Sequence, residues 1–284
     1  MRSWGRRSRR WEYHDAVVFS GGGNAGAAQV GMVQALFEAG VRPDLLVGCS
    51  VGALNAAFLG IEPTPERVVG LETIWRAVGR STVFGGTRRT VARNFIRRQD
   101  HIYEPDALRA LIAGSLAIDD LADTAVPVHV VTTDLQTGAP AWWSSGDPVD
   151  ILTASACLPG VFPPVRLGSS LHVDGGVLCP VPIGRALALG AHRVWVLDVC
   201  SGRPPRLPDH PSALDVLLNS FALARYALRT ETSEDRRPGQ EVVIIGAELP
   251  DIDVRDFSRT TEMMAIGLDA ARRQVANRPH VMVA

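Results

Sequence analysis

One serine of this chain stands in a setting that favours nucleophilic chemistry. "GCSVG" places Ser50 between Gly48 and Gly52, after the apolar run "LLV" and before the helical pattern "ALNAAFLG". A serine on such a strand-to-helix turn projects its hydroxyl at a helix N-terminus, where unpaired N–H groups favour a developing anion. The pattern therefore predicts a nucleophile at residue 50. Cys49 is a rival by chemistry, but its position at the end of a buried strand favours a core side chain.

A serine hydroxyl is a weak nucleophile without a base. In "LHVDGGV", Asp174 directly follows a short apolar run, and Gly175-Gly176 would let another backbone approach closely. We expect Asp174 to be the base. Three histidines also stand in loops or at strand ends, but they lie in no motif: His101, His172 and His210.

A glycine-rich turn, "SGGGNAG", follows the apolar run "AVVF". Gly21, Gly23 and Gly26 fit the dinucleotide-binding pattern G-x-G-x-x-G, which also needs an acidic residue at the carboxyl end of the second strand. The candidate, Asp44, precedes "LLVGC" and so stands at the amino end. A nucleotide site is therefore disfavoured. We expect the loop to bind the oxyanion of an ester under attack.

The elements that must position these motifs alternate between apolar runs and helical patterns. Uninterrupted Val, Ile and Leu are typical of strands covered on both faces, so we predict an α/β fold with three α/β/α layers and a mostly parallel central sheet. "LQTGAPAWWSS" predicts a turn and an edge strand. The carboxyl ends of parallel strands face the ligand crevice, so the three motifs converge there if their strands are neighbours. The predicted strands are "AVVFS", "DLLVGC", "VPVHVVTTD", "SSLHVD", "RVWVLDV" and "EVVIIGA".

Composition narrows the classes of protein. The chain has 284 residues, of which 46% are hydrophobic, and these can bury one large core over residues 15–284. The net charge of −1 gives no whole-chain case for nucleic-acid binding. Residues 1–14 are basic without the apolar run of a signal peptide, so we expect a disordered leader or a start codon assigned too early. The cysteines lack metal-ligand spacing and indicate a reduced, cytoplasmic setting: Cys49, Cys157, Cys179 and Cys200.

Residues 80–98 hold six arginines interleaved with apolar side chains. This pattern fits a lid or a peripheral contact with anionic lipid. It fits equally a solvated insertion whose phenylalanines pack inward. The apolar side chains concerned are Val83, Phe84, Phe95 and Ile96.

The three motifs "GGGNAG", "GCSVG" and "DGG" occur in the order found in the patatin-like phospholipase family, which the chain resembles. The segment "ASACLPGVFPPV" also resembles the family's segment before the dyad aspartate, and "TTDLQTGAPAWWSSGD" and "LGAHRVWVLDV" resemble its bacterial members. The resemblance covers roughly residues 16–200. It implies a patatin-like fold and a lipid acyl hydrolase with a Ser-Asp dyad and no histidine, metal or cofactor. Ser50 would be the nucleophile and Asp174 the base. Oxyanion-hole N–H groups would come from Gly21, Gly22, Gly23 and Asn24, and supporting glycines would be Gly26, Gly48, Gly52, Gly175 and Gly176.

Two positions depart from the family pattern. Many members carry Arg or Lys where this chain has Ala25, so we expect no cation near the oxyanion hole. Cys179 stands where the family often has Asn, which removes a supporting hydrogen bond. The resemblance predicts hydrolysis of lipid carboxylic esters, as a phospholipase A or lipid acyl hydrolase. The alternative is a non-catalytic lipid-binding module on the same fold, against which the intact Ser50 and Asp174 argue.

Overall fold

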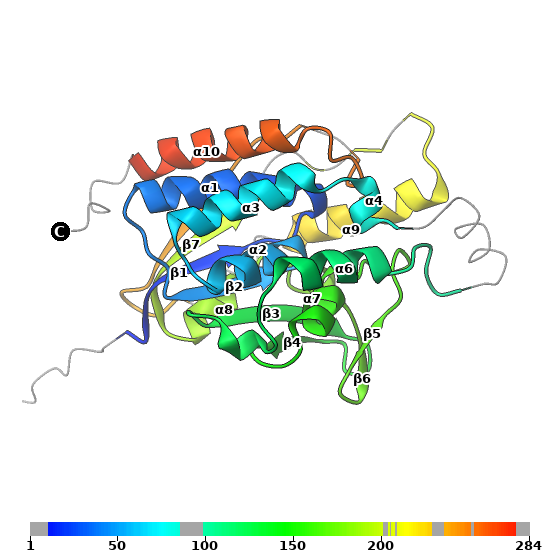
Figure 1. Ribbon diagram of the computed structural model, residues 1–284, viewed down its shortest axis with the longest axis horizontal. Coiled ribbons are helices and arrows are strands. Elements are labelled where there is room, and N and C mark those ends of the chain that lie inside the picture. Colours follow the sequence, from blue (N-terminus) through cyan, green and yellow to red (C-terminus); the bar gives the residue numbers. More distant parts are fainter. Residues whose placement is uncertain are drawn as a thin grey trace, which may run out of the picture.

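The computed structural model describes residues 11–85, 99–200, 204, 206–207, 209–228, 236–250 and 253–276. Within these residues, an eight-stranded sheet forms the centre of the molecule, in the order β5-β6-β3-β2-β1-β7-β8 with β4 paired to β3 (Figure 1). The strands are β1 (Tyr13–Phe19), β2 (Leu45–Cys49), β3 (Val128–Asp134), β4 (Ala139–Trp143), β5 (Val165–Leu167), β6 (Ser170–Asp174), β7 (Ala191–Asp198) and β8 (Glu241–Gly246).

The sheet is mostly parallel. Strands β3, β2, β1, β7 and β8 run in the same direction, whereas β4 and β6 are antiparallel to β3, and β5 is antiparallel to β6. The last strand, β8, extends the sheet beyond β7, as the sequence predicts. The turn before "APAWW" leads into β4, which is the predicted edge strand.

Helices cover the two faces of the sheet unequally. One face carries a large core, to which helices α1, α2, α3, α6, α7 and α10 contribute, and the other face is covered by the short helix α8. The helices are α1 (Gly26–Glu38), α2 (Val51–Gly60), α3 (Pro65–Ala77), α4 (Arg80–Val83), α6 (Asp106–Ser115), α7 (Pro148–Ala156), α8 (Ile183–Ala188), α9 (Ala213–Leu228) and α10 (Thr260–Ala276). Short 3₁₀ turns are η1 (Gly23–Ala25), η2 (Leu121–Asp123) and η3 (Gly175–Val177).

Strand β1 illustrates why its sequence suits the centre of this sheet. Successive side chains of a strand point to opposite faces. Val17 and Phe19 join the large core, whereas Ala16 and Val18 pack towards α8. A strand buried on both faces needs apolar residues at every position, which accounts for the uninterrupted run "AVVF".

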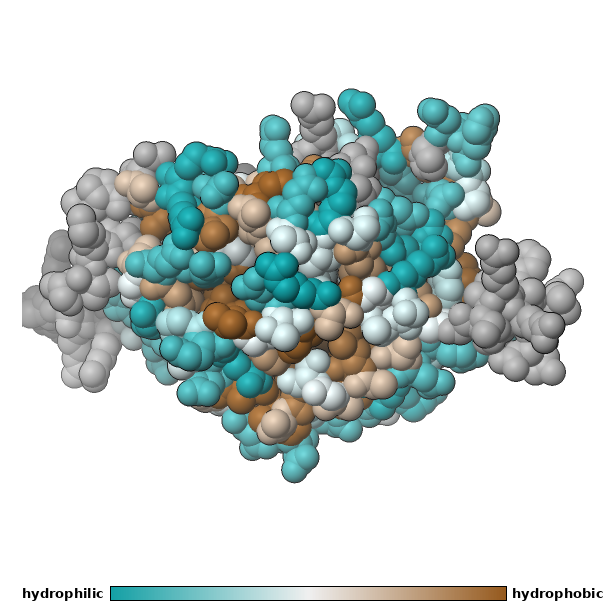
Figure 2. Space-filling model, turned by 45° about the horizontal axis from the view of Figure 1, so that its top comes forward, coloured by the Kyte–Doolittle hydropathy of each residue, from teal (hydrophilic) through white to brown (hydrophobic). Residues whose placement is uncertain are grey.

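Helix α10 packs so closely against α1 that the backbones of the two helices are in contact. A Cβ at Gly31 would overlap the Met264 carbonyl, and a Cβ at Gly267 would overlap the Ala28 carbonyl. The two helices lie side by side in Figure 1, so the last described helix is seated on the helix that begins at the glycine loop. Figure 2 shows this side of the molecule, where hydrophobic residues appear in patches between hydrophilic ones.

The N-terminal boundary differs from the prediction. Residues 1–10 lie outside the described residues, but Tyr13 already pairs with Ala191 in the sheet. The ring of Trp11 also lies 5.1 Å from that of His192. The expected leader of residues 1–14 is therefore too long, because backbone pairing with β7 orders its last residues.

Only the start of the arginine-rich segment is described. Residues 86–98, including Phe95 and Ile96, lie outside the described residues, so lipid contact through residues 80–98 stays a prediction. Phe84 is buried and stacks on Phe162, with ring centroids 5.6 Å apart. Among the described helices, none combines the length and apolar character that crossing a bilayer requires.

Candidate active site

Ser50 lies on a sharp turn between β2 and α2. Its φ of 54° and ψ of −129° make it the non-glycine residue with positive φ in the described part of the chain. Such backbone strain costs about 1–3 kcal/mol and persists where packing enforces it. A Cβ at Gly52 would lie 2.5 Å from the carbonyl oxygens of Phe19 and Ser20. A Cβ at Gly48 would lie equally close to the Ala53 Cα, so the flanking glycines let the turn close.

The Ser50 hydroxyl donates a hydrogen bond of 2.6 Å to Oδ2 of Asp174. The second carboxylate oxygen, Oδ1, accepts the Gly176 N–H at 2.7 Å. Burial raises the pKa of Asp174 to about 6, and the hydrogen bonds from Ser50 and Gly176, with the charge of Arg225, oppose that rise. Asp174 is thus a stronger base than an ordinary carboxylate and is still ionised at neutral pH.

The pairing of β3 explains how Asp174 reaches Ser50. β2 pairs with residues 128–131 of β3, β6 pairs with residues 132–134, and β4 pairs with residues 130–134. Because β4 occupies one edge of β3, β2 and β6 share the other edge and meet there end to end. Cys49 lies opposite Val131, and Asp174 lies opposite the next residue, Thr132. The ends of β2 and β6 therefore meet, although β6 is antiparallel to β3 and reaches this point from the opposite direction.

The two glycines after Asp174 allow this meeting. A Cβ at Gly175 would overlap the Val131 carbonyl, and a Cβ at Gly176 would lie 3.0 Å from Oδ1 of Asp174. The Thr133 hydroxyl donates to the Asp174 carbonyl at 3.0 Å. The backbone on both sides of the carboxylate is therefore fixed against β3.

Ser155 of α7, which was not among the predicted site residues, fixes the turn at Ser50. The Ser50 N–H donates to Ser155 Oγ at 2.9 Å, and that hydroxyl donates to the Val131 carbonyl at 2.7 Å. Both Ser155 and Ser50 are buried. Because its N–H is engaged, Ser50 does not offer its own amide to a bound anion. The only sequence signal for Ser155 is its place in "ASACLPG".

The glycine loop presents its amides unequally. The Gly21 N–H donates to the Pro180 carbonyl at 2.9 Å, so this amide is engaged within the protein. The amides of Gly22, Gly23 and Asn24 open η1, where the first N–H groups have no intrahelical acceptor. These three remain candidates for binding an anion. A Cβ at Gly26 would lie 2.6 Å from Val51 Cγ2, so this glycine lets α1 approach α2, the helix that follows Ser50.

The Asn24 side chain points away from this role. Its amide donates to the carbonyl oxygens of Asp253, at 2.9 Å, and Asp256, at 2.6 Å. Val254 lies over Gly23, whose φ is +58°, and would overlap a Cβ at that position. The loop before α10 therefore covers the glycine loop.

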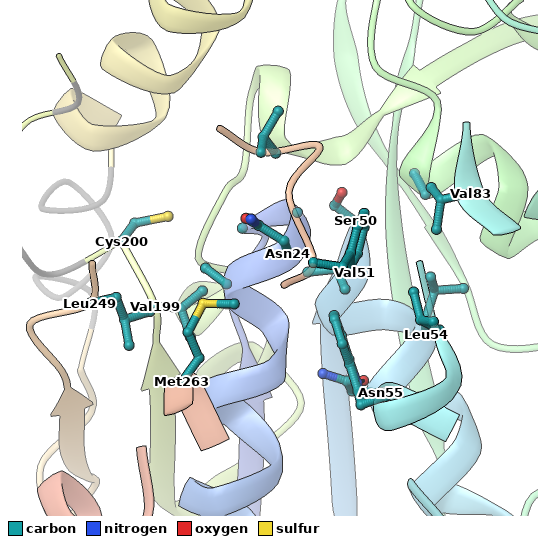
Figure 3. A pocket seen from close by; sticks show the side chains of 18 of the residues that line it. Asn24, Ser50, Val51, Leu54, Asn55, Val83, Val199, Cys200, Leu249 and Met263 are labelled. Carbon is teal, nitrogen blue, oxygen red and sulfur yellow. The ribbon is translucent and has the colours of Figure 1, made fainter. Parts of the chain in front are cut away.

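A large apolar cavity of about 740 Å³ opens beside Ser50. In the view of Figure 3, Asn24 and Ser50 lie between Val83 on one side and Val199 on the other. The walls of the cavity are largely aliphatic and aromatic side chains from α2, α3, α4, α6, α7, α9 and α10. They include Phe58, Trp75, Leu218 and Phe221, and the loops after α4 and α7 add Phe84 and Phe162.

The alternative candidates have structural partners. Asp44 accepts the backbone N–H groups of His14, at 2.7 Å, and Asp15, at 3.0 Å, at the amino end of β2. His172 is buried and lies 3.0 Å from the Thr132 hydroxyl. Burial raises the pKa of the Cys49 thiol well above its usual range, which disfavours a thiolate. Within the described residues, no group of three or more His, Cys, Asp or Glu lies together as a metal site would require.

A sequence model of the patatin-like phospholipases matches residues 17–187, more than half of the chain. The chain belongs to the patatin-like phospholipase family. All three motifs that surround Ser50 lie within the matched residues.

Similar proteins include much longer family members. Lysophospholipase nte1 of Aspergillus terreus is 26% identical over 193 residues, which cover 65% of this chain and 12% of that protein. An NTE family protein of Mycobacterium bovis is 27% identical over 286 residues, covering 94% of this chain and 47% of that protein. The chain therefore spans less than half the length of these relatives. The crystal structure of VipD from Legionella pneumophila has the same fold, with a TM-score of 0.56 and 13% identity over 94% of this chain and 67% of that one.

The structure can be compared with the two departures from the family pattern, at Cys179 and Ala25. Cys179 donates its N–H to the Gly175 carbonyl at 2.8 Å, so the backbone supports the DGG turn where the expected side-chain bond is missing. The expectation that no cation lies near the glycine loop is wrong. Arg225 of α9 is buried and donates to the Gly21 carbonyl at 3.4 Å. It comes from a part of the chain without a recognisable motif, and no local pattern indicated it.

Proposed function

We propose that this protein is a serine acyl hydrolase that cleaves lipid carboxylic esters through Ser50 and Asp174. The observation that carries the proposal is the 2.6 Å hydrogen bond from Ser50 to Asp174 at the wall of an apolar cavity. Family membership supports a lipid acyl hydrolase in general terms. The dyad and the roles of the loop amides are our assignment.

In the first step, Asp174 accepts the Ser50 proton as Oγ attacks the ester carbonyl. A pKa near 6 suits this transfer, because the carboxylate is ionised at neutral pH yet more basic than usual. The carbonyl oxygen gains the negative charge. The amides of Gly22, Gly23 and Asn24 would bind it, and each such donor contributes about 3–4 kcal/mol to the transition state.

The tetrahedral intermediate then collapses. The ester C–O bond breaks, the leaving alcohol takes the proton from Asp174, and an acyl-Ser50 ester remains. Asp174 next removes a proton from water, whose oxygen attacks the acyl carbon. Collapse of this second intermediate returns the proton to Ser50 and releases the fatty acid.

The cavity supports a long acyl chain as the recognised part of the substrate. Burying apolar surface stabilises binding by about 25 cal/mol per Å². Apolar walls offer few hydrogen bonds, so chain length and shape would decide binding there. A non-catalytic lipid-binding module would use the same cavity, and only turnover separates the two functions.

The test is hydrolysis of a panel of phospholipids, acylglycerols and short-chain esters, together with labelling by a fluorophosphonate probe. The wild type should hydrolyse long-chain esters and be labelled, whereas Ser50→Ala should lose both with its thermal melt nearly unchanged. Cys49→Ala is the matched control beside the nucleophile and should keep both. Lipid binding without turnover in the wild type would favour the binding module, and labelling lost only in Cys49→Ala would move the chemistry to the thiol.

A further inference from the structure

Helix α9 buries an arginine and leaves several large apolar side chains exposed. Arg225 is its buried residue, with 8% of its surface exposed, whereas Val216, Leu217 and Leu223 are each more than 40% exposed. Arginine is rarely buried so deeply, because desolvating its charge is costly unless a partner compensates. The position of Arg225 therefore calls for a partner in the site that it faces.

The contacts of Arg225 connect two loops of the candidate site. Its Nη2 donates to the Gly21 carbonyl at 3.4 Å and to Cys200 Sγ at 3.0 Å. Its Cδ lies 3.2 Å from the point where a Gly176 side chain would begin. Its Nε has no hydrogen-bond partner among the described residues. The Arg225 side chain therefore lies between the glycine loop and the turn that follows Asp174, and no carboxylate of the described residues is hydrogen-bonded to it.

The charged and titratable groups around Asp174 come from several elements. Cys49 ends β2, Cys157 follows α7, Cys179 follows η3 and Cys200 follows β7. Burial raises the pKa of Cys49 well above its usual range, that of Cys157 to about 12 and that of Cys179 to about 11, so these three thiols stay neutral.

Two other groups act at the edge of this site. His172 lies on β6, where its ring contacts the Thr132 hydroxyl. Burial lowers the pKa of His172, which favours the neutral ring. Arg109 of α6 acts on Cys157 and is paired with Asp150 at 2.7 Å. Among the described residues, Arg225 is the charged side chain that acts on Asp174, and Asp174 is the carboxylate that acts on Arg225.

We propose that Arg225 is a positioning residue that balances the single negative charge of the site as this charge moves during catalysis. The inference rests on the proposed function. Before attack the charge is on Asp174. After Ser50 gives up its proton, Asp174 is neutral and the charge is on the substrate oxygen at the glycine loop. A cation held between the two loops faces the charge in both positions, and α9 thus supplies the cation that position 25 lacks.

The proposal is tested with Arg225→Met, Arg225→Gln and Arg225→Lys on a soluble short-chain ester, with kcat and kcat/KM measured from pH 5 to 9. Removing the positive charge raises the pKa of Asp174, so a higher pH is needed to ionise the base. The acid limb of kcat/KM should move up by about one pH unit in the Met and Gln variants. Their plateau kcat should fall by about tenfold, because the oxyanion loses its counter-charge. Arg225→Lys should keep the wild-type limb and most of the turnover.

Arg273→Met is the control, since Arg273 of α10 is exposed and is not among the residues that line the cavity, and it should change neither quantity. An unshifted limb in folded Arg225→Met, or Arg225→Lys as impaired as Arg225→Met at every pH, would overturn the proposal. The proposal would also be overturned if Arg225→Met and Arg225→Gln both failed to fold and the folded Arg225→Lys lost the wild-type kinetics. A wild type without Ser50-dependent turnover would instead refute the proposed function.

Discussion

The part of the chain before residue 200 and the part after it meet at Ser50, but they contribute by different physical means. Before residue 200, the site is built from backbone geometry: the strained turn at Ser50, the β3 pairing and glycines that permit close approach. After residue 200, it is built from single side chains and loops that reach over the site, such as Arg225 and Val254. The family model matches residues 17–187 of the first part, and the whole of the second part lies beyond it.

This difference indicates which parts of the site can change in sequence and still keep their structural role. A backbone turn that only glycine permits leaves a recognisable pattern within a few residues. A side chain that arrives from a distant helix can be supplied by any element that packs there. Asn24 illustrates the contact between the two parts, because its amide in the first motif is bonded to carbonyl groups at residues 253 and 256.

The largest effect is expected inside the first part. Asp174→Asn preserves shape but removes proton acceptance, so kcat should fall by roughly 10²–10⁴-fold. In the wild type, activity should be lost as pH falls through about 6, where Asp174 becomes protonated. Steady-state kinetics against pH measure both quantities. His172→Gln is the control on the same strand and should keep most activity. An equal loss there would replace the dyad by a triad.

The same substitution has a second readout in stability. The pKa of folded Asp174, about 6, exceeds its ordinary value of 3.8, so the folded state binds this proton more tightly than the unfolded state. The ionised carboxylate therefore lowers stability above pH 6, and this cost is relieved as pH falls from 6 towards 4. Asp174→Asn should melt no lower than the wild type at pH 8. A clearly lower melting temperature would mean that the carboxylate stabilises the fold.

An intermediate effect is expected where the two parts touch. Gly23→Ala forces an alanine into φ +58° and against Val254, and kcat should fall by roughly 10²–10³-fold, as for loss of one oxyanion donor. Val254→Ala alone should be nearly neutral. The double variant should recover part of the activity, because it relieves the contact but not the backbone strain. Full recovery would show that the loop before α10 alone limits this position, whereas micromolar nucleotide binding would return the loop to a phosphate role.

The smallest effect is expected in the second part. Leu218→Trp fills part of the cavity from α9, so hydrolysis of long-chain esters should fall by about tenfold while short-chain esters react normally. Leu217→Trp is the matched control on the neighbouring, exposed residue and should leave both rates unchanged. If Leu218→Trp hydrolysed long-chain esters as fast as the wild type does, the acyl chain would bind elsewhere.

The amino-acid sequence predicted the parts of this site that depend on neighbours along the chain. Ser50 was predicted from five residues that join a strand to a helix, and Asp174 from one aspartate before two glycines. The α/β class and the parallel strands followed from uninterrupted apolar runs, which the sheet confirms. The glycine loop was found in the same way, although the engagement of the Gly21 amide by Pro180 depends on a residue far along the chain.

Only the tertiary structure decided how these local features meet. Strand pairing is set by the packing of the whole sheet, so the sequence did not reveal that β6 is antiparallel and meets β2 end to end on one edge of β3. Ser155 and Arg225 escaped detection for the same reason, since each acts on residues more than a hundred positions away. Local patterns record which turns a backbone can make, whereas the partners of a buried charge depend on which elements the complete fold brings together.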